Sequence, residues 1–166
     1  MDKQLSTMGL YAGITSETSG KLLLFKREES KSLFGKDYSG KWELPGGALM
    51  PNEKVSYSEL NSQLKMRVKE KLDIDIDIDE AARWGTLTIK THYGVDVAVL
   101  TCLSANVTPK KGDYAWISPR ELEGLVQNGD LVGGYGKRQH KMALMAFSES
   151  CNPKYKLEAV RALKKL

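Results

Sequence analysis

The apolar and polar positions of the chain follow two different periods. Alternation with a period of two, which is typical of strands, occurs near the start of the chain and again around residue 100. Apolar residues at three- and four-residue spacing indicate an amphipathic helix over residues 56–72. Strands interspersed with a few helices favour a mixed β-sheet that is covered by helices on its faces.

Two hairpins are predicted from strand-like runs on either side of turn residues. Residues 8–15 and 21–27 flank a loop of small polar residues and a glycine, and residues 83–90 and 95–103 flank a second turn. His92 belongs to that second turn. An exposed turn histidine is the plainer interpretation, and an acid–base role or stacking on a nucleobase is the alternative.

Asp and Ile alternate strictly from Asp73 to Asp79. A period of two suits a strand or an extended edge, with all the carboxylates on one face. Carboxylates on one face repel one another, and along an extended segment they lie too far apart to chelate one ion. We therefore expect this face to be in water.

Helices are also indicated beyond the second hairpin. Residues 113–122 are typical of a strand that enters a helix, with Ser118 as the N-cap and Pro119 in the first turn. Residues 137–147 and 155–166 are helical in pattern. On the last of these an apolar stripe is predicted at Leu157, Val160 and Leu163.

The composition fits one soluble domain. Of 166 residues, 41% are hydrophobic and 28% are charged, and this length is enough for one core. We expect a single domain over residues 1–150 and a basic helix over residues 151–166 that packs on it or extends from it. No apolar run approaches the roughly 20 residues that span a bilayer. No secretory signal is visible either, so we expect a cytoplasmic protein without membrane contact.

Charge and cysteine usage restrict the partners only weakly. A net charge of +4 permits contact with phosphates or nucleic acid but decides nothing alone. Residues 137–141, which include His140, are basic, and a solvated helix face is the plainer interpretation beside RNA binding. Cys102 and Cys151 lack metal-ligand spacing, so the sequence indicates neither a disulfide framework nor a zinc site.

Residues 41–47 carry the most specific motif. The run Trp-Glu-Leu-Pro-Gly-Gly predicts a short strand that ends in a turn, where Gly46 and Gly47 allow close backbone approaches that a Cβ would forbid. With the helix that follows, it resembles the box of the Nudix family, G-x5-E-x7-R-E-U-x-E-E-x-G-U, in which U is aliphatic. Gly47 and Glu53 satisfy the first spacing of that box.

The resemblance covers roughly residues 8–147. A later run from Trp116 to Leu122, Trp-Ile-Ser-Pro-Arg-Glu-Leu, is similar to the tryptophan and helix start that often close the fold of this family. The resemblance implies a fold of the α/β (α+β) class, a Nudix-like α/β/α sandwich with a mixed β-sheet.

The second half of the box departs from the family pattern. The alignment that keeps the aliphatic positions needs an insertion of five residues after Glu53. Met66 and Arg67 then stand where the family has Arg and Glu, and Glu70 and Lys71 stand where it has a pair of glutamates. One of the three helical glutamates is therefore retained.

These substitutions change the expected chemistry. In the family, clustered glutamates hold Mg²⁺ or Mn²⁺ against a pyrophosphate, where the metal neutralises charge and orients a water. Arg67, Glu70 and Lys71 lie on adjacent parts of one helix face, so their charges sum to about +1, where three carboxylates would give about −3. Such a surface repels a divalent cation and attracts phosphate. The plainer interpretation is that Arg67 and Lys71 are solvated.

Three hypotheses about function follow. In the first, the protein binds a nucleotide or nucleoside diphosphate derivative at Gly46, Gly47, Arg67 and Lys71, with weak or no pyrophosphohydrolase activity and no metal. In the second it is an active hydrolase. Its catalytic and metal-binding residues, for Mg²⁺ or Mn²⁺, are then Glu53, Glu70 and a carboxylate that the sequence does not identify. In the third it is a non-catalytic module that binds RNA or protein through its basic residues.

Overall fold

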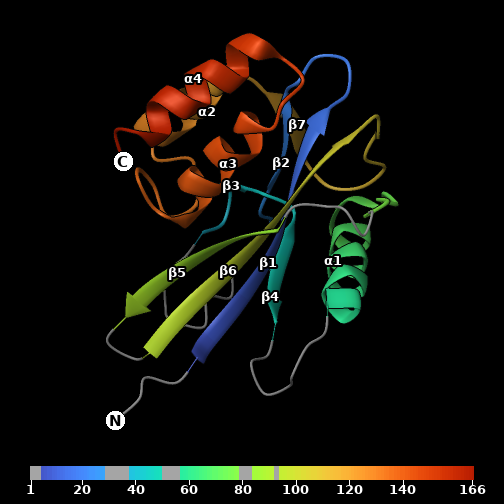
Figure 1. Ribbon diagram of the computed structural model, residues 1–166. Helices are drawn as coiled ribbons and strands as arrows, with labels where there is room; N and C mark the ends of the chain where they lie inside the picture. Colours follow the sequence, from blue (N-terminus) through green and yellow to red (C-terminus); the bar gives the residue numbers. More distant parts are fainter. Residues whose placement is uncertain (1–4, 29–37, 50–56, 79–83, 92–93) are drawn as a thin grey trace.

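The structure of the protein, a computed structural model, describes residues 5–28, 38–49, 57–78, 84–91 and 94–166 (Figure 1). The strands are β1 (Leu5–Ser16), β2 (Leu22–Lys26), β3 (Trp42–Glu43), β4 (Gly46–Leu49), β5 (Trp84–Thr91), β6 (Gly94–Ala105) and β7 (Tyr114–Ile117). The helices are α1 (Tyr57–Leu72), α2 (Pro119–Gln127), α3 (Arg138–Ser148) and α4 (Pro153–Leu163).

The strands of the described ranges form one mixed sheet in the order β3-β2-β1-β6-β5, in which β4 also pairs with β1 and β7 with β2. β1 runs parallel to β6, whereas the β1–β2 and β5–β6 pairs are antiparallel, as the two predicted hairpins require. β2 and β4 share the remaining edge of β1, since Thr15 pairs with Leu22 and Tyr11 pairs with Gly46. β2 and β4 therefore pair with different parts of the same edge of β1. The turn from β3 to β4 leads from the part of the sheet that contains β2 to the part that contains β4.

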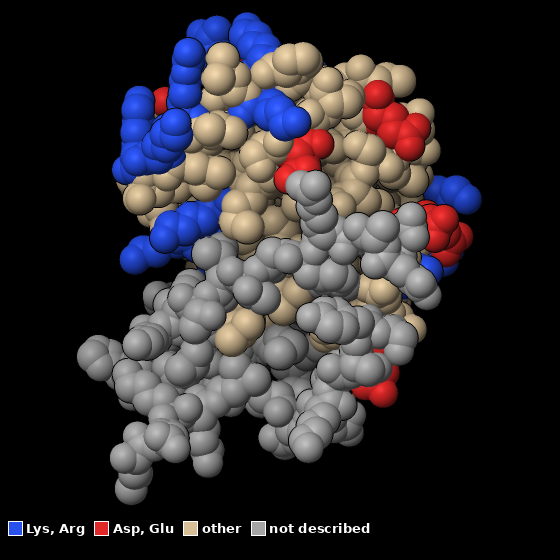
Figure 2. All heavy atoms as spheres, viewed as in Figure 1, with Lys and Arg blue, Asp and Glu red and all other residues tan. Residues whose placement is uncertain are grey.

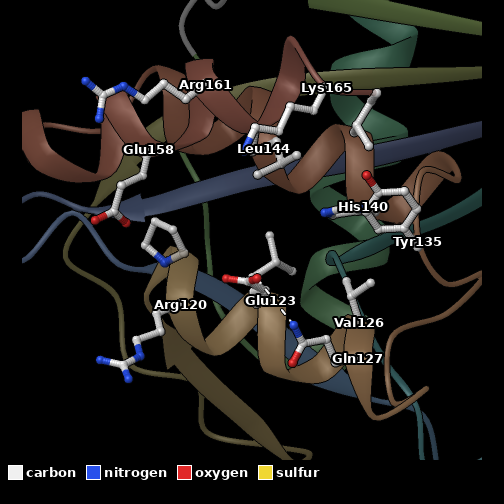
Figure 3. Close-up of a pocket in the computed structure, with 14 residues that line it drawn as sticks. Arg120, Glu123, Val126, Gln127, Tyr135, His140, Leu144, Glu158, Arg161 and Lys165 are labelled. Atoms are coloured by element: carbon white, nitrogen blue, oxygen red, sulfur yellow. Dashed lines mark hydrogen bonds between the residues drawn. The ribbon is translucent and has the colours of Figure 1, made fainter.

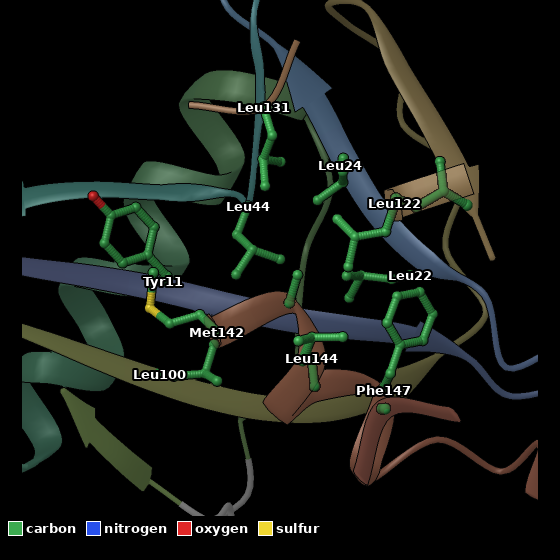
Figure 4. Packing of buried hydrophobic residues seen from close by; sticks show 14 of the residues in the cluster. Tyr11, Leu22, Leu24, Leu44, Leu100, Leu122, Leu131, Met142, Leu144 and Phe147 are labelled. Atoms are coloured by element: carbon green, nitrogen blue, oxygen red, sulfur yellow. The ribbon is translucent and has the colours of Figure 1, made fainter. Parts of the chain in front are cut away.

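Helices cover both faces of the sheet. Figure 1 shows α1 on one side and the group of α2, α3 and α4 on the other. Side chains of β1 alternate between the two cores: Leu10 and Ile14 pack under α1, and Tyr11 packs under α3. The core on the α3 side joins Met142 and Phe147 to the strands (Figure 4). The α/β/α sandwich predicted from the resemblance is confirmed.

The amphipathic pattern of α1 is confirmed. Leu64, Val68 and Leu72 recur every four residues and are fully buried against the sheet. The structure describes this helix from Tyr57 onward, so Ser56, with which the predicted helix begins, lies outside the described residues.

Residues 73–78 alternate as predicted but belong to no strand of the described chain. Ile74, Ile76 and Ile78 are buried in the core under α1, which holds this segment in an extended path without a strand partner. Asp73 has φ of 50° and its N–H bonds the carbonyl of Lys69, so the helix ends there. Lys69 Nζ lies 3.0 Å from a carboxylate oxygen of Asp73.

The start of α2 forms from local sequence alone. Ser118 Oγ accepts a hydrogen bond from the backbone N–H of Glu121 at 3.2 Å, and Glu121 Oε1 accepts one from the N–H of Ser118 at 3.1 Å. These two bonds satisfy backbone donors that a helix start otherwise leaves unpaired. The predicted N-cap is confirmed.

The apolar stripe predicted for the last helix is wrong at two of its three residues. Leu157 and Val160 remain 50% and 37% exposed, whereas Leu163 packs against the core as predicted. The other contacts of α4 with the core are made by Tyr155, Ala159 and Ala162, and the small alanines let its backbone approach α3 closely. Within the described ranges, none of the helices combines the length and apolar character needed to cross a membrane.

Candidate functional site

The turn between β3 and β4 is fixed from both sides. Gly46 has φ of 144°, and a Cβ there would lie 1.9 Å from the carbonyl oxygen of Leu10, so only glycine fits. The carbonyl of Pro45 accepts a bond from Ala12 N at 2.8 Å. On the α3 side, Gln139 Oε1 accepts a bond from Leu44 N at 2.9 Å. β1 and α3 together hold the turn rigid.

Arg67 of α1 lies against this turn. A Cβ added to Gly47 would be 3.1 Å from Arg67 Nη1 and 3.3 Å from its Cδ, so the glycine makes room for the guanidinium. The Nε atom of Arg67 is buried and has no hydrogen-bond partner in the part of the chain that the structure describes. A buried donor without an acceptor is costly, which marks this position as suited to an anion.

A buried carboxylate lies beside the turn. Glu43 pairs across the sheet with Phe25, is only 3% exposed, and accepts a bond from Arg27 Nε at 2.8 Å. Burial raises the pKa of Glu43, and the cations of Arg27, Lys71 and Arg138 act in the opposite direction. Lys71 Nζ lies 5.6 Å from the centre of the Phe25 ring, so its side chain leans from α1 towards the sheet.

Arg138 approaches the same region from the opposite face of the sheet. Its Nη2 donates to the Tyr11 hydroxyl at 3.3 Å, and its guanidinium carbon lies 5.5 Å from the centre of that ring. Burial raises the pKa of Tyr11, which stays protonated at neutral pH. The Tyr11 hydroxyl is thus a polar group of fixed position beside the turn.

We call the cations around this turn the basic cluster; they are Arg27, Arg67, Lys71 and Arg138. With Glu43 as the one carboxylate among these five side chains, they leave a net charge of about +3 if Glu43 is ionised. A surface of this sign attracts phosphate and opposes the binding of a divalent cation.

The structure brings some of the predicted site residues together and leaves others apart. Arg67 lies against Gly47, and Lys71, one turn further along α1, lies over the Phe25 ring beside Glu43. Glu70 is exposed on the same helix. The described residues contain no group of three or more His, Cys, Asp or Glu side chains that could hold a metal ion.

Two further predicted residues, Glu53 and His92, lie outside the described residues. The carboxylates that are described do not provide the ligand set that Mg²⁺ or Mn²⁺ prefers, since Glu43 is paired with Arg27 and Glu70 points into solvent. A metal site of the family's kind would require Glu53 and Glu70 together.

Sequence reasoning missed four residues of the site: Tyr11, Arg27, Glu43 and Arg138. Because Glu43 lies within a run of core residues, its burial could have been predicted from the sequence. Tyr11 and Arg138 are far apart in sequence and meet only because α3 packs on β1. Their pairing leaves no local pattern.

His140 does not lie on an exposed helix face, as the basic pattern of residues 137–141 predicted. It is 7% exposed, and its Nδ1 accepts a bond from Gly136 N at 2.9 Å. Burial also lowers its pKa. The loop that precedes α3 folds back over the ring, which the charge pattern of residues 137–141 does not indicate.

The mixed sheet between α1 and three helices, with a Gly-Gly turn under α1, is the Nudix fold. No protein-family model matches the sequence, and no curated protein does so. Solved structures do match, among them a MutT protein from Methanosarcina mazei Go1 with a TM-score of 0.51 and 20% identity, over 99% of this chain and 97% of that one.

Two further structures match with similar scores. The Nudix domain of NrtR from Shewanella oneidensis, solved with ADP-ribose, aligns over 75% of this chain and 79% of its own, with a TM-score of 0.51 and 17% identity. The E. coli dihydroneopterin triphosphate pyrophosphohydrolase aligns over 87% and 96%, with a TM-score of 0.53 and 12% identity. At these identities the comparisons establish the fold.

Proposed function

We propose that the protein binds a nucleotide or nucleoside diphosphate derivative through its phosphates at the basic cluster, with weak or no hydrolysis. The observation that carries this proposal is the position of Arg67. Its guanidinium lies against Gly47, its Nε is buried without an acceptor among the described residues, and it stands where the family resemblance expects a glutamate.

Arginine at this position suits a phosphate in particular. The guanidinium presents a planar fork of donors that matches two phosphate oxygens, and such charge-assisted bonds are about twice as strong as neutral ones. Lys71, one helical turn further, adds a second charge on the same flank of α1. The two side chains can therefore take over the role of neutralising phosphate that a metal performs elsewhere in this family.

The compounds named for two of the similar structures support this ligand class. The Nudix domain of NrtR was solved with ADP-ribose, and the E. coli enzyme is a dihydroneopterin triphosphate pyrophosphohydrolase. Both compounds contain a pyrophosphate link.

Weak or absent hydrolysis follows from the charges. A metal-assisted attack on pyrophosphate needs carboxylates to hold the ion, and the described flank of α1 offers Glu70 between two cations. The rival proposal is an active hydrolase in which Glu53 and Glu70 bind Mg²⁺ or Mn²⁺. It requires the ion to lie next to Arg67 and Lys71, which electrostatic repulsion disfavours.

Thermal-shift binding and an assay of pyrophosphate cleavage test these proposals together. ADP-ribose, ADP and adenosine are each added with Mg²⁺, with Mn²⁺ or with EDTA. We expect ADP-ribose and ADP to stabilise the protein in EDTA, because phosphate is held without a metal. Adenosine, which has no phosphate, should not. Metal-dependent cleavage of ADP-ribose to AMP and ribose 5-phosphate would instead support the hydrolase.

A matched pair of variants assigns the binding to the cluster. Arg67→Gln should weaken ADP-ribose about tenfold or more, since hydrogen bonds to a charged group contribute about 1.5–3 kcal/mol. Lys65→Gln removes the same charge from an exposed position about 160° around the helix from Arg67 and should leave binding unchanged. Equal effects of the two variants would exclude a specific role for Arg67.

A basic surface supports the interaction module as a second candidate. The basic residues of α4 and its end are exposed, namely Lys154, Lys156, Arg161, Lys164 and Lys165. Figure 2 shows Lys and Arg gathering at the upper left of the view, over this helix. RNA binding that weakens steeply with added salt would support this candidate.

A further inference from the structure

A cavity lies on the opposite side of the sheet from α1, away from the basic cluster. It encloses about 550 Å³ between α2 and α4, with α3 as its floor (Figure 3). α2 and α4 both rest on α3 and leave a trench between them. The basic cluster contributes no residue to its lining.

The floor and lower walls of this pocket are apolar. Leu122 and Val126 face it from α2, Leu144 from α3 and Ala162 from α4. Leu122 and Leu144 belong to the buried core, so the floor is continuous with the rigid interior. A preformed apolar wall of this kind binds the ring or chain of a small ligand without a large ordering cost.

An aromatic pair closes one end. Tyr135 is 65% exposed, and its ring centre lies 5.3 Å from that of His140 at an angle of 48°. His140 Nδ1 accepts from Gly136 N, so in the neutral imidazole the proton lies on Nε2. Burial lowers the pKa of His140 and favours this neutral form. The pair thus offers an exposed ring face and one N–H donor.

Charged side chains surround the rim of the pocket. In the described parts of the chain, the five charged side chains of the lining form no salt bridges with one another; they are Arg120, Glu123, Glu158, Arg161 and Lys165. Glu123 accepts a bond from Gln127 at 3.3 Å. Figure 3 shows Lys165 on the α4 side and Glu123 on the α2 side of one opening. Cations exceed carboxylates by one.

We propose that this pocket binds a small planar aromatic molecule that carries a carboxylate. Its ring lies on the apolar floor against Tyr135 and His140, and its carboxylate accepts from Lys165 Nζ and His140 Nε2. The size of the pocket selects this occupant. A volume of about 550 Å³ matches small-molecule sites, whereas a helix of three turns, roughly 16 Å by 10 Å, needs more than about 1,000 Å³.

The proposal is independent of the phosphate site. Arg138 and Gln139, at the start of α3, face Tyr11 and Leu44, whereas His140 faces the pocket. Variants in α2 and α4 therefore leave the basic cluster intact, and ADP-ribose binding serves as an internal control for folding and for the first site.

The test uses benzoate, 2-naphthoate and indole-3-carboxylate, each against its neutral amide, with binding followed by NMR shifts of the protein. We expect at least one carboxylate to bind saturably and to shift the resonances of Tyr135 and His140, and its amide to bind about tenfold more weakly. Lys165→Met should abolish the preference for the carboxylate. Tyr135→Ala should weaken both compounds without loss of stability, because the side chain is exposed.

Ala162→Phe fills the trench and should prevent binding of every probe, and the control Leu157→Ser lies outside the lining of the pocket and should have no effect. The proposal is overturned if none of the carboxylates binds saturably. It is also overturned if binding survives Ala162→Phe in protein that still unfolds cooperatively, or if Lys165→Met leaves the preference for the carboxylate unchanged.

Discussion

The Gly-Gly turn and the flank of α1 that faces it differ in how closely they resemble the Nudix box. The turn has the Trp-Glu-Leu-Pro-Gly-Gly run, and it is held through its backbone: Gly46 has no room for a Cβ, Leu44 is fully buried, and backbone hydrogen bonds join the turn to β1 and to α3. In the alignment that keeps the aliphatic positions, the flank of α1 has Arg67 and Lys71 where the box has glutamates. The fold as a whole is nevertheless the Nudix fold.

The difference separates what determines the fold from what determines the chemistry. α1 is held by Leu64, Val68 and Leu72 on its buried side, and none of these contacts depends on residues 67, 70 and 71. The charges on the flank can therefore change sign without loss of these three apolar contacts. The turn has no such freedom, because its backbone itself forms the contact with β1.

The largest effect is expected from Gly46→Val. The added Cβ would meet the Leu10 carbonyl at 1.9 Å in a backbone conformation that valine does not adopt. We expect the free energy of unfolding to fall by more than about 4 kcal/mol, measured by urea denaturation. Gly124→Ala is the control, because no atom lies within 4 Å of the added Cβ, and it should stabilise α2 by about 0.5–1 kcal/mol. Similar losses in both variants would contradict the steric account of the turn.

Reversing the charge of two α1 side chains should change phosphate and metal binding while the fold of the turn stays the same. Arg67→Glu with Lys71→Glu restores three carboxylates to one flank and leaves the turn intact. We expect ADP-ribose affinity in EDTA to fall by more than about 100-fold, and Mg²⁺ or Mn²⁺ to bind where it did not before. Calorimetric titration measures both. Unchanged ADP-ribose affinity would place the phosphates away from α1.

The sequence predicted the elements that depend on local contacts. The period of four in α1, the alternation of residues 73–78 and the N-cap at Ser118 are each indicated by neighbours along the chain. It failed where a residue's environment is supplied by a distant segment. His140 is buried because a preceding loop folds over it, and Leu157 is exposed because α3 meets α4 at Ala159.

The candidate site divides in the same way. Arg67 and Lys71 were found through their spacing in a resembling motif, and the structure places both beside the turn. Arg27 and Arg138 have no motif, and only the pairing of β2 with β3 and the packing of α3 on β1 bring them there. The two cations of α1 were thus predicted from the sequence, whereas the other two cations of the basic cluster were not.

Glu43 should give the turn a pH dependence that α1 lacks. Its pKa is raised by burial, so the folded protein holds this proton more tightly than the unfolded chain does. The resulting stabilisation is complete below the unfolded pKa of 4.5 and is lost as the pH rises through the raised value. Relative to Glu43→Gln, which does not titrate, the wild type should therefore lose stability as the pH rises.

Urea denaturation of both proteins between about pH 4 and 8 measures this difference. Asp77→Asn removes an exposed carboxyl outside the turn and serves as the matched control against which the difference for Glu43→Gln is read. A difference for Glu43→Gln that grows in favour of the wild type as the pH rises would mean that Arg27 outweighs burial at this carboxyl.

The smallest effect is expected from Glu70→Gln, and it is the most informative about catalysis. Glu70 is exposed, so the variant should keep its stability within about 0.5 kcal/mol and its ADP-ribose affinity within about twofold. In a working hydrolase the same carboxylate would hold the metal, and its loss would lower metal-dependent cleavage of ADP-ribose to AMP and ribose 5-phosphate far more than it lowers binding. A silent Glu70 therefore means that α1 has become a phosphate receptor, whereas a large loss of turnover with unchanged binding means that Arg67 and Lys71 coexist with a metal.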